Sequence, residues 1–277
     1  MVLARRHSLD GVLRLQDVAT SSRRDVRPMR PGLIQICAYL LSGDSRTGVD
    51  LTGLRIMLVA DLLARVAELS GIQALTAHVG DIQDPGIPSG LVMDSLGIHP
   101  PTASAASAEL LQTPWAGPAD VYVVGPNASP DPGRPGISIA VGMARVGEAD
   151  SEVGHMTEVL CKRDADPLTL RLALMSVSYP HPTDLTAGAL MGARRTLDRW
   201  RHRVAEWAEF PSGPVPPRFK TMIGDRFDEL AIAPVIDLLD ELARSDEVPA
   251  GAKFETFVFA DRILGLNLVR AIGQPRR

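Results

Sequence analysis

LIQICAYLL (residues 33–41), LTGLRIMLVADLLARVAELS (51–70) and IQALTAHV (72–79) are the three stretches that decide the fold. The first and third are short apolar runs, which predicts buried strands. The middle run places apolar residues at nearly helical spacing, and Gly71 follows it where a helix C-cap is expected. A strand–helix–strand order of this length predicts the βαβ unit of a parallel sheet.

Outward from this unit, the apolar pattern predicts further strands at Val121–Val124 and Ile137–Val146. A short helix is expected at Ala103–Gln112. The first thirty residues mix charged and small side chains, so we expect a loosely structured lead-in there. A loop is expected at Gly125–Gly136 (GPNASPDPGRPG), because prolines and glycines dominate it.

From Pro167 onward the pattern becomes helical. Residues 168–176 and 184–209 have helical spacing, and so do 219–242 and 253–269. Pro234 must start or kink the helix that contains it. We therefore expect an α/β fold: a Rossmann-type parallel-sheet domain over residues 1–166, followed by a helical bundle domain over 167–277.

The composition is that of an ordinary globular chain, with 45% hydrophobic and 22% charged residues among 277. A net charge of −4 gives no global attraction for nucleic acid. Two cysteines exclude a disulfide framework and a Cys-only zinc site. With no apolar run of about 18 residues, we expect no membrane segment and a cytoplasmic protein. The nucleotide-binding motifs GxGxxG and GxxxxGK[ST] are missing, so we expect no cofactor. The nucleophile motif GxSxG is missing as well.

Several segments, in the right order, resemble the cysteinyl-tRNA synthetase family and its relative, the cysteine ligase of mycothiol biosynthesis. The run LIQICAY is similar to the family's strand with Tyr-x-Cys-Gly, and residues 51–70 look like its HIGH helix with a following Asp and Leu-Arg-Arg. Further similar segments are AHVGDIQD (77–84), MDSLGIHPPTASA (93–105), DVY (120–122), GMARVGEADSE (142–152) and DPLTLRLALMSVSYPHPTDLT (166–186). The resemblance implies a class I synthetase-like catalytic domain.

The two ATP motifs of the family are degenerate here. The first motif, HIGH, contacts phosphates in the family, and its positions are occupied here by Asp50, Leu51, Thr52 and Gly53. An Asp at the first of these positions would repel phosphate. Asp50 also suits a second role, as the N-cap of the helix that begins at Leu51. GEADSEV (147–153) replaces the Lys-Met-Ser-Lys-Ser segment, so that Glu148 and Ser151 lie in an anionic loop without lysine.

The zinc site that the resemblance implies is also reduced. Cys37 falls on the family's first zinc ligand, but the region that should supply the other ligands holds no Cys, His or Glu. We therefore expect no metal, and Cys37 is expected to be a buried strand cysteine. Cys161 lies beside Lys162 and Arg163, and we expect it to be inert as well.

Further candidates lie near the strands and on one helix. Tyr39 and Cys37, together with His78 and Asp81 after the second strand, are pocket candidates at the carboxyl edge, where open α/β sheets bind ligands. Arg134 in the proline-rich loop could hold an anion. Arg194, Arg195, Arg199, Arg201 and Arg203 form either a solvated helix face or a surface for RNA phosphates or a partner.

These departures predict a pseudo-enzyme that keeps the pocket for a small molecule, an aminoacyl group or a partner. A tRNA acceptor end and another protein are the macromolecules to consider. No anticodon-reading segment is recognised, so specific tRNA selection would need another partner. Two alternatives stay open: an ATP-dependent ligase or aminoacyl transferase with rebuilt motifs, and a structural or regulatory subunit.

Overall fold

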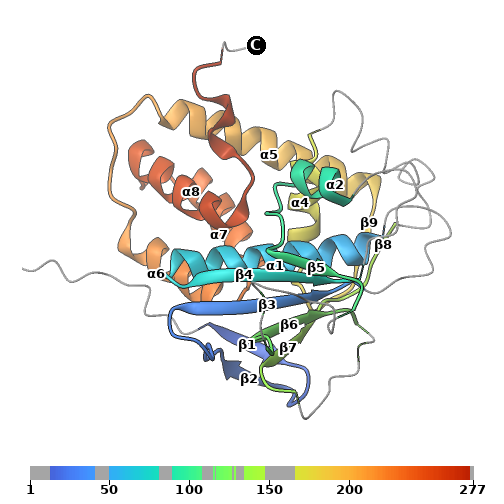
Figure 1. Ribbon diagram of the computed structural model, residues 1–277. Coiled ribbons are helices and arrows are strands. Elements are labelled where there is room, and N and C mark those ends of the chain that lie inside the picture. Colours follow the sequence, from blue (N-terminus) through green and yellow to red (C-terminus); the bar gives the residue numbers. More distant parts are fainter. Residues whose placement is uncertain are drawn as a thin grey trace, which may run out of the picture.

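The computed structural model describes residues 13–40, 50–80, 89–107, 115, 117–126, 128, 134–146 and 166–274. A five-stranded parallel sheet lies at its centre, in the order β5-β4-β3-β6-β7 (Figure 1). Its strands are β3 (Leu33–Tyr39), β4 (Gln73–Val79), β5 (Ala103–Ala105), β6 (Val121–Val124) and β7 (Ile137–Ala140). The predicted parallel α/β fold is confirmed.

Helix α1 (Leu51–Leu69) connects β3 to β4 and packs on one face of the sheet. Most of its residues are buried, because the sheet covers one side of it and the C-terminal helices cover the other (Figure 1). This is why its sequence is apolar nearly all round rather than along one stripe. Two charged side chains, Arg55 and Asp61, are buried within it.

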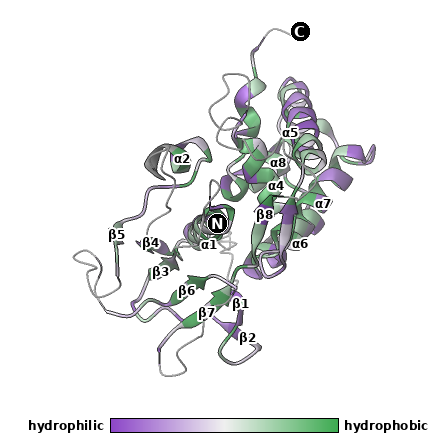
Figure 2. Cartoon of the chain, turned by 90° about the vertical axis from the view of Figure 1, so that its right-hand side faces the viewer, coloured by the Kyte–Doolittle hydropathy of each residue, from purple (hydrophilic) through white to green (hydrophobic). Residues whose placement is uncertain are grey.

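The C-terminal region is helical, as predicted. It contains α4 (Leu168–Met175), α5 (Ala187–Trp207), α6 (Pro217–Asp228), α7 (Ile232–Arg244), α8 (Ala250–Leu264) and the 3-10 helix η3 (Leu268–Ala271). Phe257 of α8 makes edge contacts with Trp200 and Trp207 of α5 at centroid distances of 5.6 and 5.2 Å. In Figure 2 hydrophobic and hydrophilic residues mix along α5, in agreement with its predicted amphipathic pattern.

One hydrophobic core runs through the sheet, α1 and the C-terminal helices. It joins Ile36 of β3 and Leu54 of α1 to Leu170 of α4 and Phe257 of α8. The division into two domains near residue 167 stays a prediction. Among the described helices none is long and apolar enough to cross a membrane.

Two local expectations were wrong. Part of the lead-in is a hairpin, β1 (Arg14–Asp17) with β2 (Ser22–Asp25), and it is anchored to β7 because the Val18 N–H donates to the Ser138 carbonyl at 2.8 Å. Residues 103–105 form edge strand β5 instead of starting a helix, because pairing with β4 overrides their local preference. The region 219–242 is helical as predicted. It forms two helices, separated where Leu230 adopts a φ of 52°, and Pro234 lies in the first turn of the second helix, in agreement with the expectation that it starts or kinks a helix.

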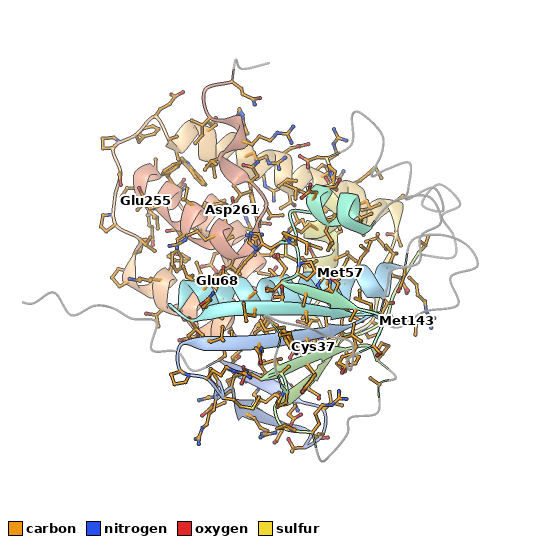
Figure 3. The ribbon with its side chains drawn as sticks, viewed as in Figure 1. Cys37, Met57, Glu68, Met143, Glu255 and Asp261 are labelled. Atoms are coloured by element: carbon orange, nitrogen blue, oxygen red, sulfur yellow. The ribbon has the colours of Figure 1, made fainter. Side chains whose placement is uncertain are left out.

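Residues 137–146 are likewise divided between two sheets. β7 belongs to the central sheet, whereas β8 (Ala144–Val146) pairs in parallel with β9 (Thr183–Leu185), just before α5. Met143 lies between them, at the end of the molecule where α1 begins (Figure 3). Helix α2 (Ser89–Ser95) lies between β4 and β5 in the chain.

Candidate functional site

The N-terminus of α1 is capped by its own chain. The Asp50 side chain accepts the Gly53 N–H at 3.0 Å, which confirms the predicted N-cap. Thr52 Oγ1 accepts the Ala144 N–H at 3.1 Å and lies 3.2 Å from the Ala144 carbonyl, to which it can donate. Asp50 and Thr52, which the resemblance aligns with the first ATP motif of the family, therefore bind the protein's own backbone, and Asp50 places a carboxylate at the positive end of the helix.

Arg55, one turn further along α1, holds the segments beside this N-terminus. Its Nη1 donates to the carbonyls of Gly142 and His181 at 3.1 and 2.6 Å, and its Nη2 donates to those of Val177 and Ser178 at 2.9 and 3.0 Å. Burial lowers the pKa of Arg55 to about 10, which leaves it charged at neutral pH. The guanidinium thus joins the end of the sheet to the turn after α4.

Gly142 allows this close approach. A Cβ at this position would lie 2.3 Å from the carbonyl carbon and oxygen of His181, a distance that no side chain tolerates. The family-like Gly-Met pair at residues 142–143 therefore has a structural role here, between β7 and β8.

The opposite face of the sheet carries an aromatic cluster that we call the Tyr–Arg cluster: Cys37, Tyr39, Tyr122 and Arg134. The Arg134 guanidinium lies 5.3 Å from the Tyr39 ring centroid and 4.8 Å from that of Tyr122. Cys37 is in register with Tyr122 on the neighbouring strand, so both point to the same face. Three of the predicted pocket residues, Cys37, Tyr39 and Arg134, are thus brought together.

Burial controls the ionisation of this cluster. It raises the pKa of the Cys37 thiol to about 12, against the opposing charge of Arg134, so the thiol stays protonated at neutral pH. Burial also raises the pKa of Tyr39 and of Tyr122, whose hydroxyl accepts the Ala119 N–H at 2.9 Å. Cys37 is buried in the central strands (Figure 3), as predicted.

His78 does not join the Tyr–Arg cluster. It is in register with Ala38, whose side chain belongs to the core on the α1 face, so His78 points toward α1. Burial lowers the pKa of His78 to about 4, against the attraction of Asp61. The imidazole is therefore neutral at pH 7.

A buried ionic network that the sequence analysis missed surrounds Asp61 of α1. Arg171 of α4 donates to Asp61 Oδ2 at 2.7 Å, Arg65 donates to the same atom at 2.9 Å, and the His99 N–H donates to Oδ1 at 3.1 Å. Burial favours protonation of Asp61, but the hydrogen bond from the His99 side chain, whose Nδ1 lies 3.2 Å from Oδ1, and the charges of Arg171 and Arg65 hold its pKa below the ordinary value. Polar residues inside the apolar runs 51–70 and 168–175 were the available signal.

The arginines of α5 divide into two groups. Arg194, Arg195, Arg199 and Arg203 are exposed, as either reading of this helix requires. Three of these have acidic neighbours: Arg194 with Asp198, Arg199 with Asp240 and Arg203 with Glu206. Arg201 is instead buried and pairs with Asp166, so it is no part of a surface.

Four candidates from the sequence, Asp81, Glu148, Ser151 and Cys161, lie outside the described residues. Within the described ranges, no group of three or more His, Cys, Asp and Glu side chains could hold a metal ion. The expectation that the protein uses no metal or cofactor stays a prediction.

Comparison with known proteins supports the resemblance seen in the motifs. The L-cysteine:1D-myo-inositol 2-amino-2-deoxy-alpha-D-glucopyranoside ligase of Thermobispora bispora is 31% identical over 108 residues, which cover 39% of this chain and 26% of the ligase. The cysteine–tRNA ligase of Xanthobacter autotrophicus is 38% identical over 100 residues, 35% of this chain and 21% of that ligase. No known family profile matches the chain.

The matched part thus spans about a quarter of the length of these relatives. Over that part the chain is similar to the cysteinyl-tRNA synthetase family, and its Rossmann-like sheet with C-terminal helices agrees with the fold that the resemblance implies.

Proposed function

We propose that this protein is a cysteinyl-tRNA synthetase-like binding protein that does not form an aminoacyl adenylate. The observation that carries the proposal is the cap of α1. The Asp50 carboxylate accepts the Gly53 N–H in the first turn of the helix, where the family binds ATP phosphates. A phosphate at this position would meet a negative charge and would have to displace a formed hydrogen bond.

The binding surface in this proposal is the Tyr–Arg cluster. Two tyrosine rings and a guanidinium suit a ligand with an apolar part and an anionic group such as a carboxylate. The Cys37 thiol is protonated at neutral pH, so it takes part as an apolar group and not as a thiolate. The ligand would be an amino acid, an aminoacyl group or a segment of a partner, bound in the cytoplasm.

Amino-acid-dependent ATP–pyrophosphate exchange tests the absence of adenylation. We expect no exchange above a no-enzyme control with cysteine or any other standard amino acid, with or without zinc. A cysteine–tRNA ligase assayed in parallel shows that the conditions support exchange, and circular dichroism shows that the sample is folded. Clear exchange would establish the alternative, a ligase with rebuilt motifs.

Tryptophan fluorescence tests the binding surface, because Trp115 packs in the same small core as Cys37 and Tyr122. We expect cysteine or another amino acid to change the emission in a saturable way, and Trp115→Phe to remove the change. Arg134→Gln should weaken binding, whereas Arg195→Gln on α5 is the matched control. Failure of every amino acid to bind, together with a stoichiometric partner on purification, would favour the structural or regulatory subunit.

A further inference from the structure

A groove with about 360 Å³ of accessible space opens at the amino-terminal ends of β6 and β7. It lies at the opposite end of the parallel strands from the α1 N-terminus, because Asp120 and Gly136 each precede a strand whereas Leu51 follows the end of β3. Its size is within the range of small-molecule sites. The lining residues are Arg24, Asp25, Arg27, Met29, Asp120, Pro135, Gly136 and Ile137.

The groove lies in a basic part of an acidic protein. Residues 14–30 contain five arginines and two aspartates, whereas the whole chain has a net charge of −4. Both aspartates are paired: Asp17 with Arg24 at 2.8 Å and Asp25 with Arg14 at 3.2 Å. Arg23 pairs with Glu229 at 2.8 Å, so the excess of positive charge in this segment comes from Arg27 and Arg30, which follow the hairpin, and it attracts anions to the groove.

The third carboxylate of the region, Asp120, is turned toward the backbone. Its Oδ1 accepts the Met29 N–H at 2.6 Å, and its Oδ2 accepts the Gln35 N–H at 2.7 Å. With 3% of its surface exposed, Asp120 fixes the groove wall, and the two N–H groups that it accepts offset part of its negative charge.

Arg24 is held in position for an anion. Its Nη1 donates to Asp17, which is itself buried and accepts the N–H groups of Ala19 and Ser138. Within the described part of the chain, no hydrogen bond engages Arg24 Nε or Nη2, or any nitrogen of the exposed Arg27. These donors are the ones available to a ligand.

The rest of the wall is apolar and rigid. Ile137 and Pro135 lie beside Met29, whose surface is 45% exposed. Gly136 has a φ of +99°, and a Cβ there would lie 2.5 Å from the Ala119 carbonyl oxygen, so the backbone closes tightly against Ala119. An apolar wall next to free guanidinium donors suits the organic part of an anionic ligand.

We propose that this groove is a binding site for an organic phosphate monoester, with its phosphate oxygens bound by Arg24 and Arg27. The planar donor set of arginine matches both phosphate and carboxylate, and the higher negative charge of a phosphate monoester suits a site with two guanidinium groups. Met29 and Pro135, the exposed apolar residues of the wall, contact the organic group. The site is independent of the proposed function, because it shares no residue with the Tyr–Arg cluster or with the cap of α1.

Isothermal titration of the whole protein with phenyl phosphate tests the proposal. We expect saturable binding that is tighter than for inorganic phosphate, which lacks the apolar group, and tighter than for benzoate, which lacks the phosphate. Arg27→Gln should weaken binding about tenfold, the effect of one charge-assisted hydrogen bond. Arg24→Gln should do so at least as strongly, and Arg195→Gln, the same charge change on α5, should leave affinity within about twofold.

Because Arg27 has no partner within the described residues, its substitution should leave thermal stability unchanged, so a loss of affinity reports the site itself. Absence of phenyl phosphate binding to the folded wild-type protein would overturn the proposal. So would equal weakening by Arg195→Gln, which indicates general charge attraction. An oligoribonucleotide that binds equally well with and without a 5′-phosphate, and loses affinity in Arg27→Gln, would replace the monoester by a nucleic acid backbone.

Discussion

The two faces of the central sheet hold charged side chains in different environments, buried on the α1 face and exposed on the other. On the α1 face, Arg55, Asp61 and Arg171 are at most 4% exposed, and each is bound by several groups from distant parts of the chain. On the other face, the charge of Arg134 is exposed and rests on two tyrosine rings. The difference teaches that the buried charges stabilise the fold, whereas an exposed guanidinium over aromatic rings stays available to a ligand.

The largest expected effect comes from the α1 face. Asp61→Asn leaves the buried Arg171 without its counter-charge, and breaking one partner of a buried pair costs about 3–5 kcal/mol of unfolding free energy. Urea denaturation followed by circular dichroism measures the loss. Glu68→Gln, on an exposed position of the same helix, is the control and should change stability by less than about 0.5 kcal/mol. A small effect of Asp61→Asn would mean that the network is not structural.

The second effect depends on pH and also belongs to the α1 face. Burial lowers the pKa of His78 from 6.5 to about 4, so between these values the unfolded chain binds a proton that the folded chain does not. The free energy of unfolding is therefore highest above pH 6.5. It falls by up to about 3 kcal/mol as the pH drops from 6.5 toward 4. Urea midpoints across this range measure it, and His78→Gln should flatten the slope. Identical slopes in both proteins would place the titration elsewhere.

Gly142→Ala tests the contact that Arg55 maintains beside the sheet. The added methyl group would lie 2.3 Å from His181 backbone atoms, and such overpacking costs about 1–3 kcal/mol. Thermal unfolding measures the change. Gly192→Ala on α5, where nothing lies within 4 Å, should instead raise stability by about 0.5–1 kcal/mol, since alanine favours a helix. If both variants behave alike, the close approach at Gly142 does not exist in solution.

The smallest stability effect is expected on the other face. Arg134→Ala removes two exposed cation–π contacts, each worth about 0.5–1 kcal/mol at most, so the urea midpoint should move little. The same variant should lose amino acid binding measured by Trp115 fluorescence. A large loss of stability would show that Arg134 is a structural residue like Arg55, and the contrast between the faces would fail.

Sequence patterns predicted the elements whose signals are local and strong. The apolar runs 33–41 and 72–79 with a long helix between them predicted the parallel pair β3 and β4. The spacing of three and four residues between Leu197, Trp200 and Val204 predicted α5. Asp50 was recognised as a cap because the interaction reaches across only three residues. Such features depend on neighbours in the chain, and the chain displays them directly.

Tertiary structure decided what depends on distant partners. The hairpin β1–β2 is anchored to β7 more than a hundred residues away, and the short strand β5 exists because β4 offers it a free edge. Cys37 and His78 lie in the neighbouring strands β3 and β4, yet the alternation of strand side chains places them on opposite faces of the sheet. In the sequence, Arg171 is a single charge in an apolar helix. Its role as an ion-pair partner is evident only after folding brings it within 2.7 Å of Asp61, 110 positions earlier. Local periodicity determines helices and strands, whereas burial and ion pairing are properties of the packed chain.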